Sequence, residues 1–112
     1  LFFLPDMDLG AKDAVFVPFF GVNAATVDAV PRLAMLTDAK IVPVTVRQFG
    51  PNKPYEIEFF PAWENYPSGD LLADTKFMNE FIESQVKKMP EQYYWVHKRF
   101  KTRPSNEATL YD

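Results

Sequence analysis

Short apolar runs separated by proline-rich polar connections make up the first part of the chain, and this pattern predicts strands. Residues 1–4 (LFFL) form a continuous apolar run ended by Pro5, which is typical of a buried strand reaching its carboxyl end. Residues 14–21 are also apolar but include Pro18, which cannot donate a hydrogen bond to a neighbouring strand. We therefore expect residues 14–21 to form an edge strand or a strand that leads into a loop.

A second pair of apolar runs lies near the middle of the chain. Residues 40–47 are mostly apolar and β-branched, and residues 55–60 alternate large apolar residues with glutamate, as a half-buried strand does. The sequence GPNKP between them has the composition of a turn. The pattern predicts two adjacent antiparallel strands.

Residues 24–36 have apolar positions at helical spacing, and Asn23 is a suitable residue to cap a helix there. Pro31 lies inside this segment. Because proline removes a backbone donor, we expect it either to kink the helix or to mark a restart.

Residues 71–89 predict a longer helix lying across the sheet, with Ser68 or Asp70 as its cap. Pro90 is suited to the first position of a second, short helix. The predicted core face of the long helix consists of Phe77, Phe81, Ile82, Val86 and Met89.

The order strand, helix, strand, strand, helix predicts an α/β fold, a mixed β-sheet covered by helices. With 112 residues the chain has the length of one domain, and residues 105–112 are expected to be a loose tail. The first residues include no initiating methionine and no signal-peptide pattern. We interpret residues 1–112 as the carboxyl-terminal portion of a single domain whose amino-terminal part supplies neighbouring strands.

Composition limits the functional classes. The chain has no cysteine, so disulfides and thiolate metal sites are excluded. No apolar stretch reaches the roughly 20 residues that cross a bilayer. The formal net charge of −3 argues against a nucleic-acid partner, because such proteins usually present a broad basic surface.

One stretch departs from this acidic balance, namely residues 93–104 (YYWVHKRFKTRP). Within six residues it holds four of the twelve lysines and arginines, Lys98, Arg99, Lys101 and Arg103. One interpretation is a solvated helix end over packed aromatic residues, helped by the helix dipole. The other is an anion site, in which Arg99 and Arg103 bind phosphate or carboxylate groups. If residues 91–101 are helical, Tyr93, His97 and Lys101 share one face.

His97, the only histidine, has cationic neighbours and no carboxylate nearby in the sequence to orient it as a catalytic base. We therefore expect it to have a supporting or anion-binding role.

Asp6 and Asp8 follow the first apolar run, at a strand end where open α/β sheets bind ligands. Three interpretations remain open: a divalent metal pair, turn capping by bonds to nearby backbone N–H groups, and the orientation of a cationic partner. A calcium-binding loop fails, because Val17 stands where its bidentate glutamate is required. We expect neither a metal nor a cofactor.

Two long phrases, FFLPDMDLGAKDAVFVPFFG near the start and MPEQYYWVHKRFKTRP near the end, together with KIVPV between them, carry a family resemblance. The chain resembles the carboxyl-terminal half of the late acyltransferases of lipid A biosynthesis, the lauroyl and myristoyl transferases of the lysophospholipid acyltransferase superfamily. The resemblance implies an acyltransferase-type α/β/α domain. It also implies transfer of a fatty acyl chain from acyl carrier protein to a hydroxyl of a lipid A precursor. The reaction would take place at the cytoplasmic face of the cell inner membrane, which the protein would reach through an amino-terminal part outside this chain.

The resemblance has a clear limit, because the family's catalytic motif, a histidine followed after four residues by an acid, is absent. Five places after His97 stands Thr102, so no catalytic residue can be named. As substrate-binding or supporting residues it implies Asp6, Asp8, His97, Arg99 and Arg103, and the matched motifs also include Gly10, Phe16, Pro18, Phe19, Thr26 and Phe100. A basic cluster suits an anionic acceptor or an acidic donor protein. The alternative is a non-catalytic α/β module that binds an anionic lipid or a protein partner.

Overall fold

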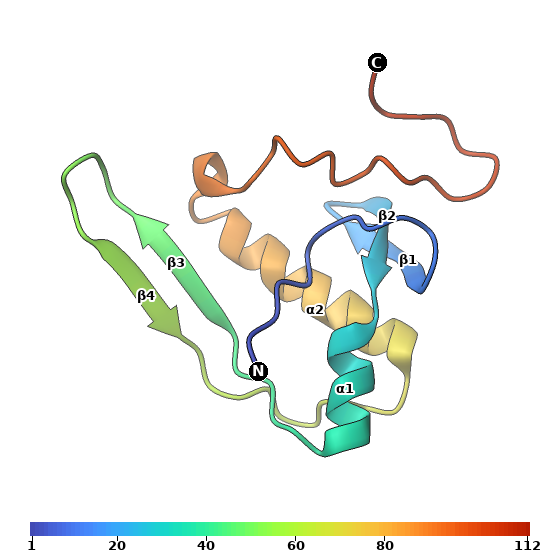
Figure 1. Ribbon diagram of the computed structural model, residues 1–112, viewed down its shortest axis with the longest axis horizontal. Coiled ribbons are helices and arrows are strands. Elements are labelled where there is room, and N and C mark those ends of the chain that lie inside the picture. Colours follow the sequence, from blue (N-terminus) through green and yellow to red (C-terminus); the bar gives the residue numbers. More distant parts are fainter.

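A computed structural model describes residues 1–112 and divides them into two small antiparallel sheets and two helices, with long irregular segments at both ends (Figure 1). The α/β class predicted from the sequence is confirmed in this form, although the strands do not join into one sheet. No helix here is both long and apolar enough to cross a bilayer. The elements are, in order, β1 (Ala14–Phe19), β2 (Val22–Val27), α1 (Ala29–Thr37), β3 (Val44–Gln48), β4 (Tyr55–Phe59), α2 (Leu71–Val86) and the 3₁₀ helix η1 (Pro90–Gln92).

Strands β1 and β2 form a tight hairpin, in which Ala14 pairs with Val27 and Phe19 with Val22. Its two turn residues, Phe20 and Gly21, both have positive φ, at 50° and 76°. This is the conformation of a two-residue hairpin turn that matches the twist of the strands. The helix expected over residues 24–36 is therefore wrong in its first half, because the turn commits residues 22–27 to pairing with β1.

Helix α1 begins at Ala29, after Asp28 in the N-cap position. Pro31 is its third residue, where the backbone N–H has no partner inside a helix, so proline is tolerated there. Pro31 therefore lies in the first turn of the helix and does not kink it. Of the two alternatives, the helix begins near the proline. Asn23 is not a cap but a strand residue opposite Pro18.

The predicted pairing of β3 with β4 is confirmed, with Val44 opposite Phe59 and Gln48 opposite Tyr55. Strand β3 starts after Pro43, four residues later than the apolar run suggested. A backbone hydrogen bond from Trp63 N–H to the Ile41 carbonyl, at 2.9 Å, holds the two chain segments together beyond the open end of the hairpin.

Helix α2 begins as predicted, because the Asp70 carboxylate accepts hydrogen bonds from the backbone N–H groups of Leu72 (3.0 Å) and Ala73 (3.1 Å). It ends at Val86, three residues before the predicted Met89. Its main packing is against β1, so the expectation that it lies across the β3–β4 sheet is wrong.

The buried face of α2 agrees with the predicted one only in part, because Val86 is buried and Ile82 packs against the core as predicted, but other positions differ. Phe77 is 45% exposed and packs beside Trp63, with ring centroids 5.0 Å apart. Asn79 is fully buried instead, because its amide nitrogen bonds to the Pro18 carbonyl (3.3 Å) and the Thr26 hydroxyl (3.2 Å). The buried residues of α2 are Asp74, Thr75, Met78, Asn79 and Val86.

Residues 1–4 are irregular and exposed, so the strand predicted there is wrong for this chain. A strand needs a partner for its backbone groups, and neither sheet includes these residues.

The conditional helix over residues 91–101 is also not formed. Pro90 begins a helix as predicted, but η1 ends at Gln92 and the chain then runs irregularly past the β1–β2 hairpin (Figure 1). The Trp95 indole N–H donates to the Pro90 carbonyl at 2.6 Å and its backbone N–H to the Tyr93 carbonyl at 2.8 Å, which turns the chain away from a helical path. The looseness of residues 105–112 stays a prediction.

Candidate functional site

The loop of residues 5–10 meets the segment of residues 97–103, about ninety positions later, at the side chain of Asp8. Asp8 is fully buried. Its Oδ2 accepts the backbone N–H of Thr102 at 2.8 Å, and its Oδ1 accepts the Thr102 hydroxyl at 2.8 Å. The same Oδ1 accepts the N–H of Gly10 at 3.0 Å, and Gly10 has a φ of 100°, which glycine adopts without steric cost. The turn-capping interpretation is therefore observed at Asp8.

The ionisation of Asp8 follows from these bonds. Burial raises the pKa of the Asp8 carboxyl, but the hydrogen bonds from Thr102 and Gly10 and the charge of Lys101 lower it by more. The net pKa lies below its ordinary value of 3.8, so Asp8 is a carboxylate at neutral pH.

His97 contacts the same residue from the other side. The backbone N–H of Asp8 donates to His97 Nε2 at 2.8 Å. In this contact Nε2 is the acceptor. The ring therefore holds the backbone at Asp8, and it is not arranged as a base oriented by a carboxylate.

Arg99 is 1% exposed and lies against β2. Its Nη1 donates to the Ala25 carbonyl at 2.7 Å, its Nη2 donates to the Thr26 hydroxyl at 2.8 Å, and its guanidinium lies 5.4 Å from the centroid of the Phe19 ring. Burial lowers the pKa of Arg99, while its interactions with Tyr93 and with the charges of Asp8 and Asp6 act in the opposite direction. Both terminal nitrogens of the guanidinium are thus engaged within the protein.

Arg103 contacts β2 near its beginning, at a different residue from those that Arg99 contacts. Its Nη1 donates to the Asn23 carbonyl at 2.7 Å, and its Nη2 forms an ion pair with Glu107. Neither Arg99 nor Arg103 forms a salt bridge with Asp6 or Asp8. The structure therefore brings Asp8 and His97 into contact, places Arg99 beside them, and sets Arg103 apart.

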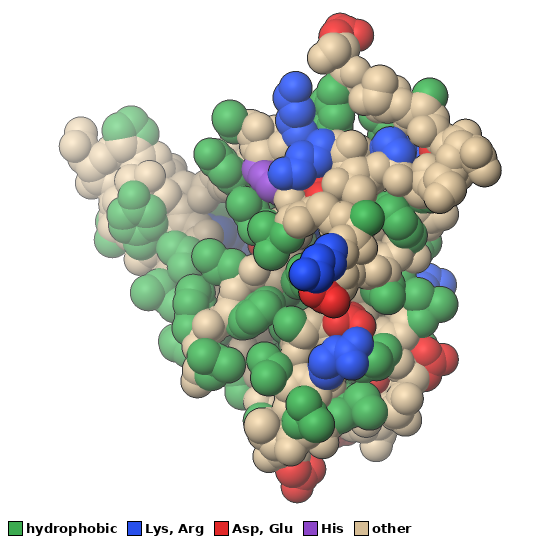
Figure 2. Space-filling view, turned by 45° about the vertical axis from the view of Figure 1, so that its right-hand side comes forward, with side chains coloured by type: hydrophobic (Ala, Val, Ile, Leu, Met, Phe, Trp, Pro, Cys, Tyr) green, Lys and Arg blue, Asp and Glu red, His purple; other side chains and the backbone are tan.

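Asp6 lines a cavity of about 930 Å³ whose walls are mostly hydrophobic. The walls come from residues 1–6, the inner faces of α1 and α2, and β3, and hydrophobic side chains spread over much of the adjoining face (Figure 2). Tyr93 also lines the cavity, and burial and then the charge of Asp6 raise the pKa of its hydroxyl. Asp6 and Tyr93 are therefore polar members of a mostly apolar lining, which also includes Thr37, Lys40, Thr45, Arg47, Gln85 and Gln92.

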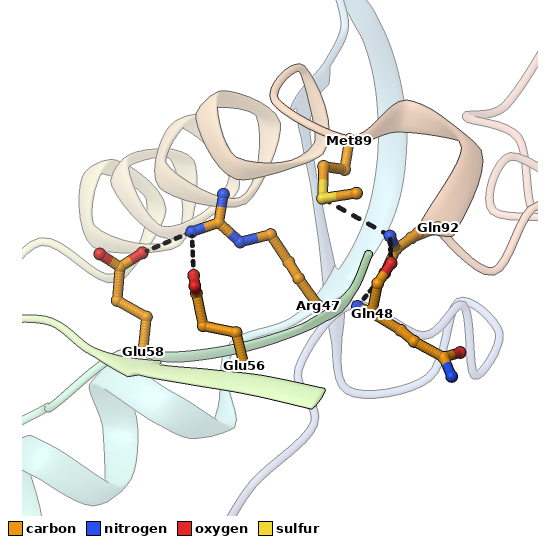
Figure 3. Close-up of polar contacts among 6 residues, drawn as sticks. All are labelled: Arg47, Gln48, Glu56, Glu58, Met89 and Gln92. Carbon is orange, nitrogen blue, oxygen red and sulfur yellow. Dashed lines mark hydrogen bonds and ion pairs between the residues drawn. The ribbon is translucent and has the colours of Figure 1, made fainter. Parts of the chain in front are cut away.

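A second contact that the sequence did not indicate lies on β3, where Gln92 pairs with the free edge of the strand (Figure 3). The backbone N–H of Gln48 donates to Gln92 Oε1 at 2.9 Å, and the Gln92 amide nitrogen donates to the Gln48 carbonyl. Beside it, Arg47 Nη2 bonds to Glu56 at 2.8 Å and to Glu58 at 3.2 Å.

The ion pairs of Arg47 had a signal in the sequence. Its strand neighbour alternates glutamates at the two positions that an arginine opposite can reach. Gln92 and Thr102 had none, because their partners are more than forty residues away.

Comparison with known proteins gives a consistent result. A family model described as bacterial lipid A biosynthesis acyltransferase matches residues 1–102. The chain is 39% identical over 112 residues to the lipid A biosynthesis palmitoleoyltransferase of Escherichia coli, covering 99% of this chain and 36% of that protein. It is 36% identical over 112 residues to the lauroyltransferase of the same organism, covering 99% and 37%, and 34% identical over 110 residues to the myristoyltransferase, covering 98% and 34%. The chain thus spans about a third of the length of these curated relatives.

Proposed function

The chain belongs to the bacterial lipid A biosynthesis acyltransferase family, and on that premise we propose that the protein transfers a fatty acyl chain from acyl carrier protein to a hydroxyl group of a lipid A precursor. The observation that carries the proposal is the match of residues 1–102 to the family model. The names of the similar proteins, which specify palmitoleoyl, lauroyl and myristoyl transfer, support a fatty acyl donor.

The reaction is an ester-forming substitution. The acceptor hydroxyl oxygen attacks the thioester carbonyl, the carbon–sulfur bond breaks, and the thiol of the carrier protein leaves as the ester forms. A general base takes the hydroxyl proton, which ends on the leaving sulfur. The resemblance places that base and its acid in a motif that this chain lacks, so residues 1–112 supply the scaffold and ligand contacts and form the carboxyl-terminal portion of the acyltransferase domain.

Within that portion the five candidate residues take different roles. Asp6 is the candidate for contact with substrate, because it alone of the five lines the cavity. Asp8, His97 and Arg99 are supporting residues, because their polar groups bond to other parts of the chain. Arg103 supports the beginning of β2, forms an ion pair with Glu107, and lies nearer to the surface than Arg99.

The partners follow from the same premise. The protein acts at the cytoplasmic face of the inner membrane, held there through the part of the protein outside this chain. It uses no nucleic acid and no cofactor.

The test is to incubate the full-length protein in detergent with an acyl carrier protein thioester and a purified lipid A precursor. The expected product is heavier than the acceptor by one acyl group and is detected by mass spectrometry. Binding of the precursor without any product would favour the non-catalytic module instead.

A further inference from the structure

We propose that Asp8, His97 and Thr102, which we call the Asp8 joint, are positioning residues that hold the carboxylate of Asp6 in the wall of the cavity. The inference rests on the proposed acyl transfer, and it assigns to that reaction a residue, Thr102, that was not among the candidate site residues.

The joint constrains residue 8 from both sides. Thr102 contributes its backbone N–H and its hydroxyl to the Asp8 carboxylate, each at 2.8 Å. His97 Nε2 accepts the Asp8 backbone N–H, also at 2.8 Å. The side chain and the main chain of Asp8 are therefore tied to the same distant segment, and the Asp8 side chain has no exposure to water.

That distant segment is itself anchored to both hairpins. Arg99 lies between His97 and Thr102 in sequence, and it bonds to Ala25 and Thr26 of β2. Earlier in the same segment Gln92 bonds to the backbone of β3. The segment that holds Asp8 is therefore fixed to both sheets, and through the joint it fixes a loop that has no regular structure of its own.

Asp6 depends on the joint because only Met7 separates it from Asp8, and residues 1–10 contribute to neither sheet nor helix. Asp6 lines the cavity, whereas Asp8 is turned into the protein. Misplacing a group that contacts substrate by about 1 Å can cost on the order of a hundredfold in rate. Weakening the joint is therefore expected to lower kcat more than it raises KM.

The experiment is steady-state kinetics and thermal unfolding of the full-length enzyme with Thr102→Val, which keeps the shape of the side chain and removes one donor to Asp8. The control is Thr75→Val on α2, whose hydroxyl likewise donates one hydrogen bond inside the protein, to the Leu71 carbonyl at 2.6 Å. Thr75 is fully buried, whereas Thr102 is half-buried. We expect Thr102→Val to lower kcat about tenfold with little change in KM, from the loss of one bond to a charged group. Thr75→Val should leave kcat unchanged.

Two conservative variants separate positioning from bulk stability. Thr102→Ser keeps the hydroxyl and should restore kcat. His97→Gln places an amide oxygen near the site of Nε2, so it should retain much more of kcat than His97→Leu, and this pair provides the test if Thr102→Val does not fold. Amide hydrogen exchange at residues 6–10 should be faster in Thr102→Val than in Thr75→Val.

The outcomes distinguish the inference from the proposed function. If the wild type transfers acyl groups and Thr102→Val keeps the wild-type kcat, the positioning role is overturned and the proposed function stands. If kcat falls but Thr102→Ser does not restore it, the positioning role is likewise overturned. If the wild type itself forms no product, both are overturned.

Discussion

At the scale of single residues, charged groups are buried where the irregular terminal segment crosses the β1–β2 hairpin. Arg99 and Asp8 are both almost fully buried. The Asp8 carboxylate accepts three hydrogen bonds and the Arg99 guanidinium donates two, which offset part of the cost of removing each charge from water, although Arg99 Nε has no partner. Asn79 adds a third polar group, bonded to the same threonine of β2 as Arg99. Polar contacts therefore hold this region together as much as apolar packing does.

Arg99→Lys tests whether this burial is structural. Lysine keeps the charge but cannot reach both the Ala25 carbonyl and the Thr26 hydroxyl, so we expect a loss of about 2 kcal/mol in the free energy of unfolding. The measurement is denaturant unfolding of the full-length protein, with Lys53→Arg in the exposed β3–β4 turn as the control. Unchanged stability together with a large loss of catalytic efficiency would mean instead that Arg99 binds an anionic group of a substrate.

Asp8→Asn tests the pH dependence that the lowered pKa implies. Because the pKa of Asp8 in the folded protein lies below 3.8, the unfolded state binds this proton more readily as the pH falls. The stability contributed by the carboxylate is therefore complete well above pH 3.8 and is lost as the pH falls through that value toward the lower folded pKa. We expect Asp8→Asn to be less stable than the wild type at pH 7, and the difference in the free energy of unfolding to shrink between pH 5 and pH 2. Two curves that stay parallel over this range would contradict the assignment.

At the scale of secondary structure, each well-predicted element has a local signal. Helix α2 has its aspartate cap, and β3 and β4 have alternating residues around a glycine and proline turn. Strand β2 lacked such a signal, because the alanines of VNAATV favour a helix on intrinsic preference. The preceding turn, with Phe20 at positive φ, is also not one of the common asparagine–glycine turns. Pairing with β1 decided the outcome there.

The candidate site was predictable only in part, for a related reason. Asp8 and His97 could each be named from residue type and motif, but their contact joins positions 89 apart, and no spacing rule reaches that far. The predicted role of Arg99 as an anion ligand came from its residue type and its basic, aromatic neighbours in the sequence, whereas the structure turns its guanidinium onto β2. Long-range contacts of this kind follow from the tertiary fold.

Asp70→Ala tests the cap of α2. Removing the acceptor for Leu72 and Ala73 should cost about 1 kcal/mol in the free energy of unfolding. Glu80→Ala on the same helix is the control, because its ion pair with Lys76 is exposed and should contribute less than about 0.5 kcal/mol. Equal effects of the two substitutions in chemical denaturation would show that the cap does not stabilise α2.

At the scale of the whole molecule, large apolar side chains remain exposed along residues 1–4 and on the β3–β4 hairpin, around the cavity. Surfaces of this kind commonly mark an interface. We expect them to be covered by the rest of the acyltransferase in the full-length protein, since this chain spans about a third of the length of its curated relatives.

The isolated chain of residues 1–112 should therefore have no acyltransferase activity. It lacks the histidine and acid that the family resemblance assigns to deprotonation of the acceptor, so incubation with the thioester and the precursor should give no product above the blank. The full-length protein under the same conditions is the positive control. Turnover by the isolated chain would show that the missing motif is not the source of the base.

The contact between Asp8 and Thr102 also has a consequence for the order of folding. It joins residues 94 positions apart, so it forms only after a long loop has closed, at a high cost in chain entropy. The two hairpins and α2 depend on local contacts and can form first. Interactions made after the transition state slow unfolding without speeding folding. We therefore expect the contacts around Thr102 to lower the unfolding rate and to have little effect on the folding rate.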